Sequence, residues 1–104
     1  MIVLVRGEVW RYKPVVQRKG RSELRLIVSA DAMNNDRDMP TVYVARITAA
    51  DTGSLISARI GDHGWAQLTL IERALKSRLV ERLGVATSDE LEAVGIALRA
   101  VFEL

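Results

Sequence analysis

Apolar residues in the first two thirds of the chain come in short runs, separated by segments rich in glycine, proline and charged residues. Short runs dense in β-branched and aromatic side chains, bounded by such segments, are typical of strands. On this pattern we expect five strands, in "VWRYKPVV" (9–16), "LRLIVSA" (24–30), "TVYVARIT" (41–48), "LISARI" (55–60) and "WAQL" (65–68). Pro14 places the first at a sheet edge or a strand end. The last two are joined by "GDHG", which fits a four-residue hairpin loop.

The spacing of apolar residues changes after these strands. In "LIERALKSRLVERLG" (70–84), Leu75, Leu79 and Leu83 recur at every fourth position, and Gly84 follows as a typical end of a helix. We therefore expect a helix over this segment.

The segment "TSDELEAVGIALRAVFEL" (87–104) predicts a carboxy-terminal helix. Thr87 and Glu90 have the spacing of a capping box, in which each side chain binds the backbone N–H of the other. Apolar residues then form one stripe, made of Leu91, Val94, Leu98 and Val101. Gly95 costs about 1 kcal/mol relative to alanine inside a helix, so we expect it to mark a close contact between helix and sheet.

Strands that precede long helices predict a mainly β fold with some α structure. We expect a small, twisted, antiparallel barrel or half-barrel with a carboxy-terminal helix. A chain of 104 residues fits one domain, and no linker, repeat or low-complexity segment divides residues 1–104.

Composition excludes several classes of protein. Apolar residues make up 49% and charged residues 27%, as in ordinary globular domains. The chain has no cysteine, which rules out disulfides, thiolate metal sites and cysteine nucleophiles. No apolar run approaches the ~18 residues of a membrane span, and no secretory signal is recognisable. We therefore expect a cytoplasmic protein that does not enter a membrane.

Charge is distributed unevenly along the chain. Residues 1–25 carry seven basic and two acidic side chains, whereas the remainder carries eight basic and eleven acidic ones. Clustered lysine and arginine favour a polyanionic partner, because they release counterions from a phosphate backbone. The alternative is a basic face that contacts only solvent, and the charge pattern alone favours neither interpretation.

Several segments, taken in order, resemble those of one protein family. "RGEVW" (6–10) resembles the opening of the MazF/PemK-like toxins, the endoribonucleases (mRNA interferases) of type II toxin–antitoxin systems. Further segments of the chain resemble that family's second strand, third strand and closing part, namely "RLIVSAD" (25–31), "PTVYVARITAAD" (40–51), "AQLTLIE" (66–72) and "SRLVERLGVATSDELEAVGIALRAVFEL" (77–104). The resemblance implies an SH3-like (CcdB/PemK-type) barrel with short helices, which works as a homodimer.

The same resemblance implies an activity and a site. It implies metal-independent cleavage of single-stranded RNA at short sequences, without a cofactor, and silencing by a cognate antitoxin protein. In the matching positions Arg25 corresponds to the family's catalytic arginine and Thr48 to its catalytic threonine. Gln67 falls where the family often has a polar residue that lines the RNA groove.

The chemistry of RNA cleavage suits these residue types. When the ribose 2′-OH attacks the adjacent phosphorus, a 2′,3′-cyclic phosphate forms through a phosphorane whose negative charge must be neutralised. The planar fork of an arginine can bind two phosphate oxygens and stays charged, and a threonine hydroxyl can donate to the same oxygens. Arginine is a poor general base, since its pKa exceeds ~12, so only the resemblance suggests that Arg25 also moves the proton.

Each candidate has a plain structural alternative. Arg25 could be a strand-end arginine paired with Glu23 or an aspartate, and Thr48 an ordinary β-branched strand residue. Arg18, Lys19 and Arg21 lie in a glycine-containing loop and are candidates for RNA backbone contacts, or for a solvated loop.

The remaining candidates are weaker. His63, the single histidine, could serve acid–base chemistry, but its place in "GDHG" predicts an exposed hairpin tip. One histidine among scattered carboxylates makes no metal site. Trp10, Tyr12 and Tyr43 could stack on bases, although we expect Trp10 and Tyr43 to pack in the core.

Two other functions fit the same fold. Gyrase poisons similar to CcdB act by binding a topoisomerase without catalysis, but they depend on a Trp-Gly-Ile-like ending, and this chain ends in "VFEL". An RNA-binding barrel without nuclease activity is the other alternative.

Overall fold

The computed structural model describes residues 3–16, 18–54 and 56–104. Strands dominate the chain, and one long helix closes it. In chain order the elements are β1 (Glu8–Tyr12), β2 (Leu24–Ile27), α1 (Asp31–Asn34), β3 (Thr41–Thr48), β4 (Ser57–Ile60), the 3₁₀ turn η1 (Gly61–His63), β5 (Gly64–Leu75), the 3₁₀ turn η2 (Lys76–Arg78), β6 (Leu79–Val85) and α2 (Ser88–Phe102).

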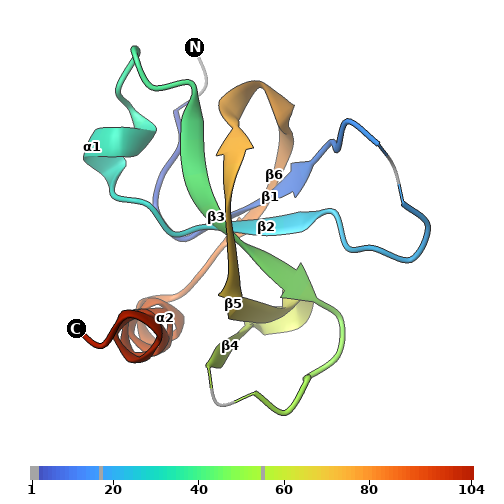
Figure 1. Cartoon of the computed structure of the whole chain (residues 1–104), viewed down its shortest axis with the longest axis vertical. Coiled ribbons are helices and arrows are strands. Elements are labelled where there is room, and N and C mark those ends of the chain that lie inside the picture. Colours follow the sequence, from blue (N-terminus) through green and yellow to red (C-terminus); the bar gives the residue numbers. More distant parts are fainter. Residues whose placement is uncertain (1–2, 17, 55) are drawn as a thin grey trace.

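The strands form one six-stranded sheet in the order β4-β5-β3-β2-β1-β6, and all its neighbouring strands run antiparallel. The sheet is strongly twisted, and α2 packs against β4 and β5 on one side of it (Figure 1). This architecture confirms the expected mainly β, antiparallel SH3-like fold with a carboxy-terminal helix.

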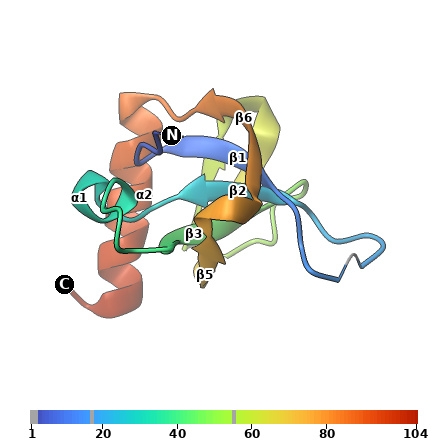
Figure 2. The same ribbon diagram turned by 90° about the horizontal axis from the view of Figure 1, so that it is seen from above.

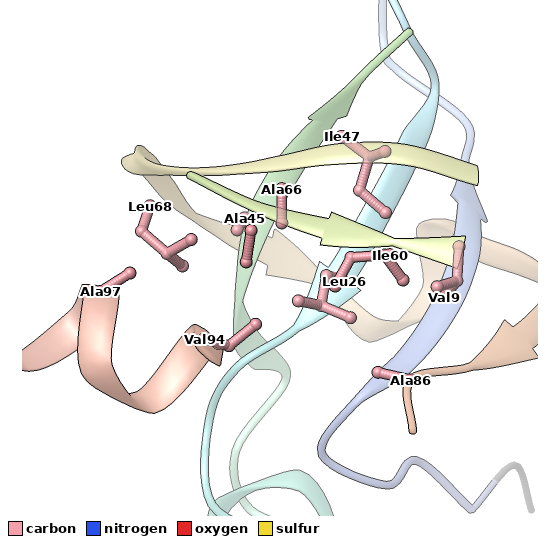
Figure 3. Packing of buried hydrophobic residues seen from close by; sticks show 11 residues of the cluster. Val9, Leu26, Ala45, Ile47, Ile60, Ala66, Leu68, Ala86, Val94 and Ala97 are labelled. Atoms are coloured by element: carbon pink, nitrogen blue, oxygen red, sulfur yellow. The ribbon is translucent and has the colours of Figure 1, made fainter. Parts of the chain in front are cut away.

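Apolar side chains cover both faces of the central strands. The larger cluster lies between the sheet and α2, which contributes Val94 and Ala97, and it takes in Leu26 of β2 (Figure 3). The smaller cluster includes Trp10 and Ile27. Because side chains alternate along a strand, the neighbours Leu26 and Ile27 enter different clusters. Strand β2 is therefore buried on both faces, which agrees with its continuous apolar run.

Helix α2 follows its sequence pattern closely. Thr87 and Glu90 form the capping box, each accepting a hydrogen bond from the other's backbone N–H. Val94 is buried, and the other three residues of the expected stripe are partly buried against the larger cluster. The expected close contact at Gly95 is wrong. The nearest atom that a Cβ there would meet belongs to Arg99 of the same helix, 3.9 Å away.

The helix expected over residues 70–84 is also wrong. This segment ends β5, turns through η2 and forms β6, which pairs with β1. Leu79 is buried in the smaller cluster, while Leu75 and Leu83 are 43% and 37% exposed. The regular leucine spacing therefore does not make one buried helical face, since strand pairing with distant segments overrides the local preference.

The remaining strands differ from expectation mainly at their ends. Strand β3 has the predicted bounds, whereas β1 stops at Tyr12, before Pro14. Of the strand expected at 55–60, the structure has Ser57–Ile60 as β4, and Leu55 lies outside the described residues. The loop between β1 and β2, in which Gln17 is also outside the described residues, projects from the sheet on the side away from α2 (Figure 2).

Candidate active site

Arg25 is held in a defined place on β2. Its side chain lies on the same face of the strand as Ile27, and the residue is only 5% exposed. Nε donates to Glu72 at 2.8 Å, and Nη1 donates to the carbonyls of Ser22 and Leu24 at 2.8 and 3.0 Å. Among the described residues Nη2 has no hydrogen-bond partner, and this atom is not fully buried. The guanidinium is thus anchored on one side and open on the other.

The ion-pair partner of Arg25 differs from the two that the sequence suggested. It is Glu72 of β5, and neither Glu23 nor an aspartate. Glu72 was not a candidate, because the segment that contains it was expected to be a helix. Its other carboxylate oxygen lies 3.6 Å from Nη2 of Arg46 on β3.

Tyr12 also contacts Arg25. The guanidinium carbon lies 5.2 Å from the centre of the Tyr12 ring, within the range of a cation–π interaction. Trp10 is 6% exposed and packs in the smaller cluster, as expected. The expectation for Tyr43 is wrong, because this residue is 41% exposed.

Thr48 ends β3 within a short chain of hydrogen bonds. Its hydroxyl donates to the carbonyl of Ala50 at 3.0 Å and accepts from Nε2 of Gln67 at 3.0 Å. Oε1 of Gln67 in turn accepts from the hydroxyl of Thr52 at 3.1 Å. Gln67 is only 3% exposed, so in this structure it holds the Thr48 hydroxyl from a buried position and does not line the surface of a groove.

Glycine is required beside Thr48. Gly64 has a φ of +128°, and a Cβ at this position would overlap the carbonyl oxygen of Thr48. The first residue of β5 can therefore approach the end of β3 only because it has no side chain.

The loop after β1 and the face that carries Arg25 enclose a hollow of about 580 Å³, here called the basic hollow. Five cationic and two acidic side chains line it, which gives the lining a net charge of +3. These side chains are Arg18, Lys19, Arg21, Arg25 and Arg46, with Glu23 and Glu72. The three loop cations proposed from sequence thus lie around the same space as Arg25. The basic excess of the first 25 residues is concentrated there.

A second hollow of about 500 Å³, here called the threonine hollow, adjoins the first. Its lining includes Thr48 and His63, and it shares Arg21, Ser22 and Arg46 with the basic hollow. The expectation of an exposed His63 is wrong. The side chain is half-buried, and a Cβ on Gly84 would lie only 2.7 Å from its Nε2.

Arg25 and Thr48 share one face of the sheet. Arg25 is the register partner of Arg46, and Thr48 follows Arg46 by two positions, so alternation puts all three side chains on the same side. Helix α2 packs elsewhere, against β4 and β5. The two residues that sequence singled out for catalysis therefore border two adjoining hollows, with Arg46 between them.

Two further properties bear on the class of protein. Within residues 3–16, 18–54 and 56–104, no group of three or more histidine, aspartate or glutamate side chains is arranged to hold a metal ion. No helix among these residues is long and apolar enough to span a membrane.

Residues 5–102 match the model of the PemK-like, MazF-like toxins of type II toxin–antitoxin systems. The chain belongs to this family. No curated protein matches it in sequence. An endoribonuclease from a mycobacterial species is structurally similar to this MazF-like chain, with a TM-score of 0.83 and 25% identity over 100% of this chain and 95% of the other.

Two complexes show the same fold. A mycobacterial endoribonuclease bound to its cognate antitoxin matches with a TM-score of 0.82 and 25% identity, over 97% of this chain and 96% of the other. A MazE–MazF complex from Deinococcus radiodurans matches with a TM-score of 0.80 and 18% identity over the full length of both chains. These likenesses, together with the family match, confirm the resemblance seen in the sequence.

Proposed function

We propose that this MazF-like chain is a metal-independent endoribonuclease that cuts single-stranded RNA at short sequences. One arrangement carries this function: in a chain of this toxin family, Arg25 and Thr48 extend from adjacent strands on one face and border two adjoining hollows, one of them strongly basic. A single-stranded RNA laid along these hollows brings a phosphate to both residues.

The geometry suits attack by the ribose 2′-OH on the neighbouring phosphorus. Arg25 approaches the phosphorane with Nη2, while Nε and Nη1 hold the side chain in place. A preorganised donor of this kind is worth roughly 3–4 kcal/mol of transition-state stabilisation. The hydroxyl of Thr48 turns from the carbonyl of Ala50 to a phosphate oxygen, and Gln67 keeps its oxygen in position. The products are a 2′,3′-cyclic phosphate and a 5′-OH.

The loop residues Arg18, Lys19 and Arg21 bind the RNA backbone on either side of the cut. Their charges attract phosphates regardless of sequence, which makes binding sensitive to salt. We assign Gln67 to positioning Thr48, because its buried amide donates to Thr48 through Nε2 and accepts from Thr52 through Oε1.

The partners follow from the family and from the charge of the site. The protein acts as a single-domain homodimer in the cytoplasm, where its RNA substrate is found. A cognate antitoxin silences it by laying an acidic segment, disordered when free, over the basic hollow. The solved antitoxin complexes of structural neighbours support this class of partner.

The test is cleavage of single-stranded RNA by the purified protein in EDTA, with analysis of the product ends. Arg25→Ala should abolish cutting, and Thr48→Val, which keeps the shape of the side chain, should lower the rate about tenfold or more. Arg37→Ala removes an exposed arginine outside both hollows and should cut normally. Full activity of folded Arg25→Ala, or a 3′-phosphate formed without a cyclic intermediate, would contradict the proposal.

A further inference from the structure

We propose that Arg46 is a second phosphate-binding guanidinium, which takes the RNA together with Arg25. This inference rests on the proposed function, in which the hollows receive single-stranded RNA. It adds a residue that neither the sequence motifs nor the resemblance singled out.

The placement of Arg46 costs stability unless an anion is present. Arg25 and Arg46 are register partners on the antiparallel strands β2 and β3. Like charges directly opposite each other in such a pair are destabilising. Glu72, the register partner of Val44, supplies one carboxylate between the two guanidiniums. Two positive charges thus share a single negative one, which leaves the cluster with an excess of positive charge.

Arg46 is the more loosely held of the two arginines. Its Nη2 lies 3.6 Å from Glu72, beyond the length of a normal hydrogen bond, whereas Nε of Arg25 lies 2.8 Å from the same carboxylate. Nε of Arg46 is the one buried side-chain nitrogen or oxygen among the described residues that lacks a hydrogen-bond partner. Such a group calls for an explanation, and a ligand that pulls the guanidinium into a tighter arrangement provides one. The side chain is 25% exposed, so a ligand can reach it.

Arg46 also lies where an RNA strand must pass. It lines both hollows and stands between Arg25 in the one and Thr48 in the other. A phosphodiester that crosses from the basic hollow to the threonine hollow meets its guanidinium on the way. Two guanidiniums on one face can bind different oxygens of one phosphate or the oxygens of two successive phosphates. The carboxylate of Glu72 already occupies a comparable position as an internal anion.

The experiment measures binding without cleavage. A labelled single-stranded RNA of mixed sequence, methylated at every 2′-hydroxyl so that it cannot be cut, is titrated with protein from about 50 to about 200 mM salt. Arg46→Ala should weaken binding about tenfold or more and make the slope of log affinity against log salt shallower by about 0.7, the value for one lost contact to a single strand. Arg46→Lys keeps the charge and should keep the slope, with weaker binding because the fork is lost.

Arg37→Ala is the matched control, since it removes the same charge from an exposed position outside both hollows. It should leave the slope as in the wild type. Thermal unfolding provides a second readout, because Arg46→Ala relieves the opposition of two cations and should not lower the melting temperature. A purely structural arginine would give the reverse result, with lower stability and an unchanged salt slope.

The outcomes separate this inference from the proposed function. If the wild type binds RNA and Arg46→Ala has the same slope as Arg37→Ala, the role of Arg46 is wrong while the nuclease function stands. If the wild type binds the methylated RNA but does not cut the unmodified strand, the nuclease function is wrong, and the slopes still decide the role of Arg46. If the wild type binds no single-stranded RNA, both are wrong.

Discussion

Glu72 and Arg25 lie on separate strands, β5 and β2, and their carboxylate and Nε are joined at 2.8 Å across the strand between them. The Arg25 side chain is 6% exposed and that of Glu72 is 39% exposed, so the arginine of the pair is buried and the glutamate is partly exposed to solvent. This relationship fixes the guanidinium of the candidate catalytic residue, which lines the basic hollow. Glu72 therefore acts as a positioning residue in the proposed site.

Removal of this carboxylate should affect both stability and rate. We expect Glu72→Ala to lower the free energy of unfolding by about 1–2 kcal/mol, because the buried charge of Arg25 loses its partner. The loss is limited because solvent around the partly exposed Glu72 already weakens the pair. Cleavage should fall about tenfold as Arg25 loses its anchor. Glu72→Gln keeps an acceptor and should lose less of both quantities. Urea denaturation and a cleavage assay measure the two effects.

Glu81→Ala is the control for Glu72→Ala. Glu81 forms a 3.3 Å ion pair with Arg11, and both side chains are about half exposed. Such a pair contributes roughly 0–1 kcal/mol, so this variant should resemble the wild type. Equal effects of the two substitutions would show that Glu72 does not position Arg25.

Gln67 should matter for the rate more than for RNA affinity. Gln67→Leu keeps the approximate volume of the buried side chain but removes the donor that holds the Thr48 hydroxyl at 3.0 Å. We expect kcat to fall about tenfold with little change in KM, because the lost contact orients the proposed catalytic hydroxyl and does not touch RNA. Thr52→Val removes only the outer bond of the chain and should have a smaller effect. A rise in KM with unchanged kcat would instead indicate that Gln67 contacts RNA.

Most of the fold could be predicted where local pattern and tertiary role agree. The β-branched run of β3 has the same bounds in sequence and structure, and the capping box and apolar stripe of α2 follow their spacing. In these segments the local pattern and the position in the fold favour the same structure. The alternation of β3 suits a central strand, and the period of α2 suits a helix packed on a sheet.

The segment 70–84 could not be read in the same way. Its leucines recur at a helical spacing, yet the structure uses them in two strands that pair with the distant β3 and β1. Local spacing carries no information on such pairings, and a helix over this segment gives no reason to expect Glu72 beside Arg25. If the start of this segment had been expected as a strand paired with β3, its carboxylate would have been a candidate partner for Arg25.

The candidate site was predicted in part for a related reason. Motif resemblance singled out Arg25 and Thr48, and the glycine-containing loop pointed to Arg18, Lys19 and Arg21, all of which line the hollows. Arg46 and Glu72 could be identified only once the strand register was known, because the pairing of strands places them next to Arg25.

Gly64 should tolerate no side chain. Gly64→Ala places a Cβ against the carbonyl of Thr48 and forces an L-residue into a φ of +128°, so we expect a loss of about 2–4 kcal/mol of stability. The end of β3 must shift to relieve the overlap, and cleavage should fall further than stability alone explains. Gly20→Ala is the control, because Gly20 also has a positive φ, of +84°, but has open space around it. If denaturation curves show equal losses of stability for the two variants, the effect comes from backbone strain alone and not from the overlap with Thr48.

Glu90 makes stability depend on pH in the acid range. Burial raises the pKa of its carboxyl. Hydrogen bonds to the backbone N–H groups of Thr87 and Gly61 and to the Thr87 side chain lower it, as does the positive charge of His63. Together these outweigh burial, so the pKa lies below its ordinary value of 4.5. The folded state therefore binds the Glu90 proton less readily than the unfolded state. The resulting stabilisation is complete above pH 4.5 and is lost as the pH falls through the lowered pKa.

Glu90→Gln removes this charge but keeps an acceptor in the capping box. We expect it to lower the free energy of unfolding by about 1 kcal/mol at neutral pH, because charge-assisted bonds to Thr87 and Gly61 become neutral ones. The difference from the wild type should shrink as the pH falls below 4.5 and through the lowered pKa, where the carboxyl of the folded wild type also becomes neutral. Urea denaturation at several pH values measures it, with Glu92→Gln, an exposed change on the same helix, as the control. A difference that stays constant into the acid range would mean that the cap stabilises α2 and the η1 turn through geometry and not through the charge of Glu90.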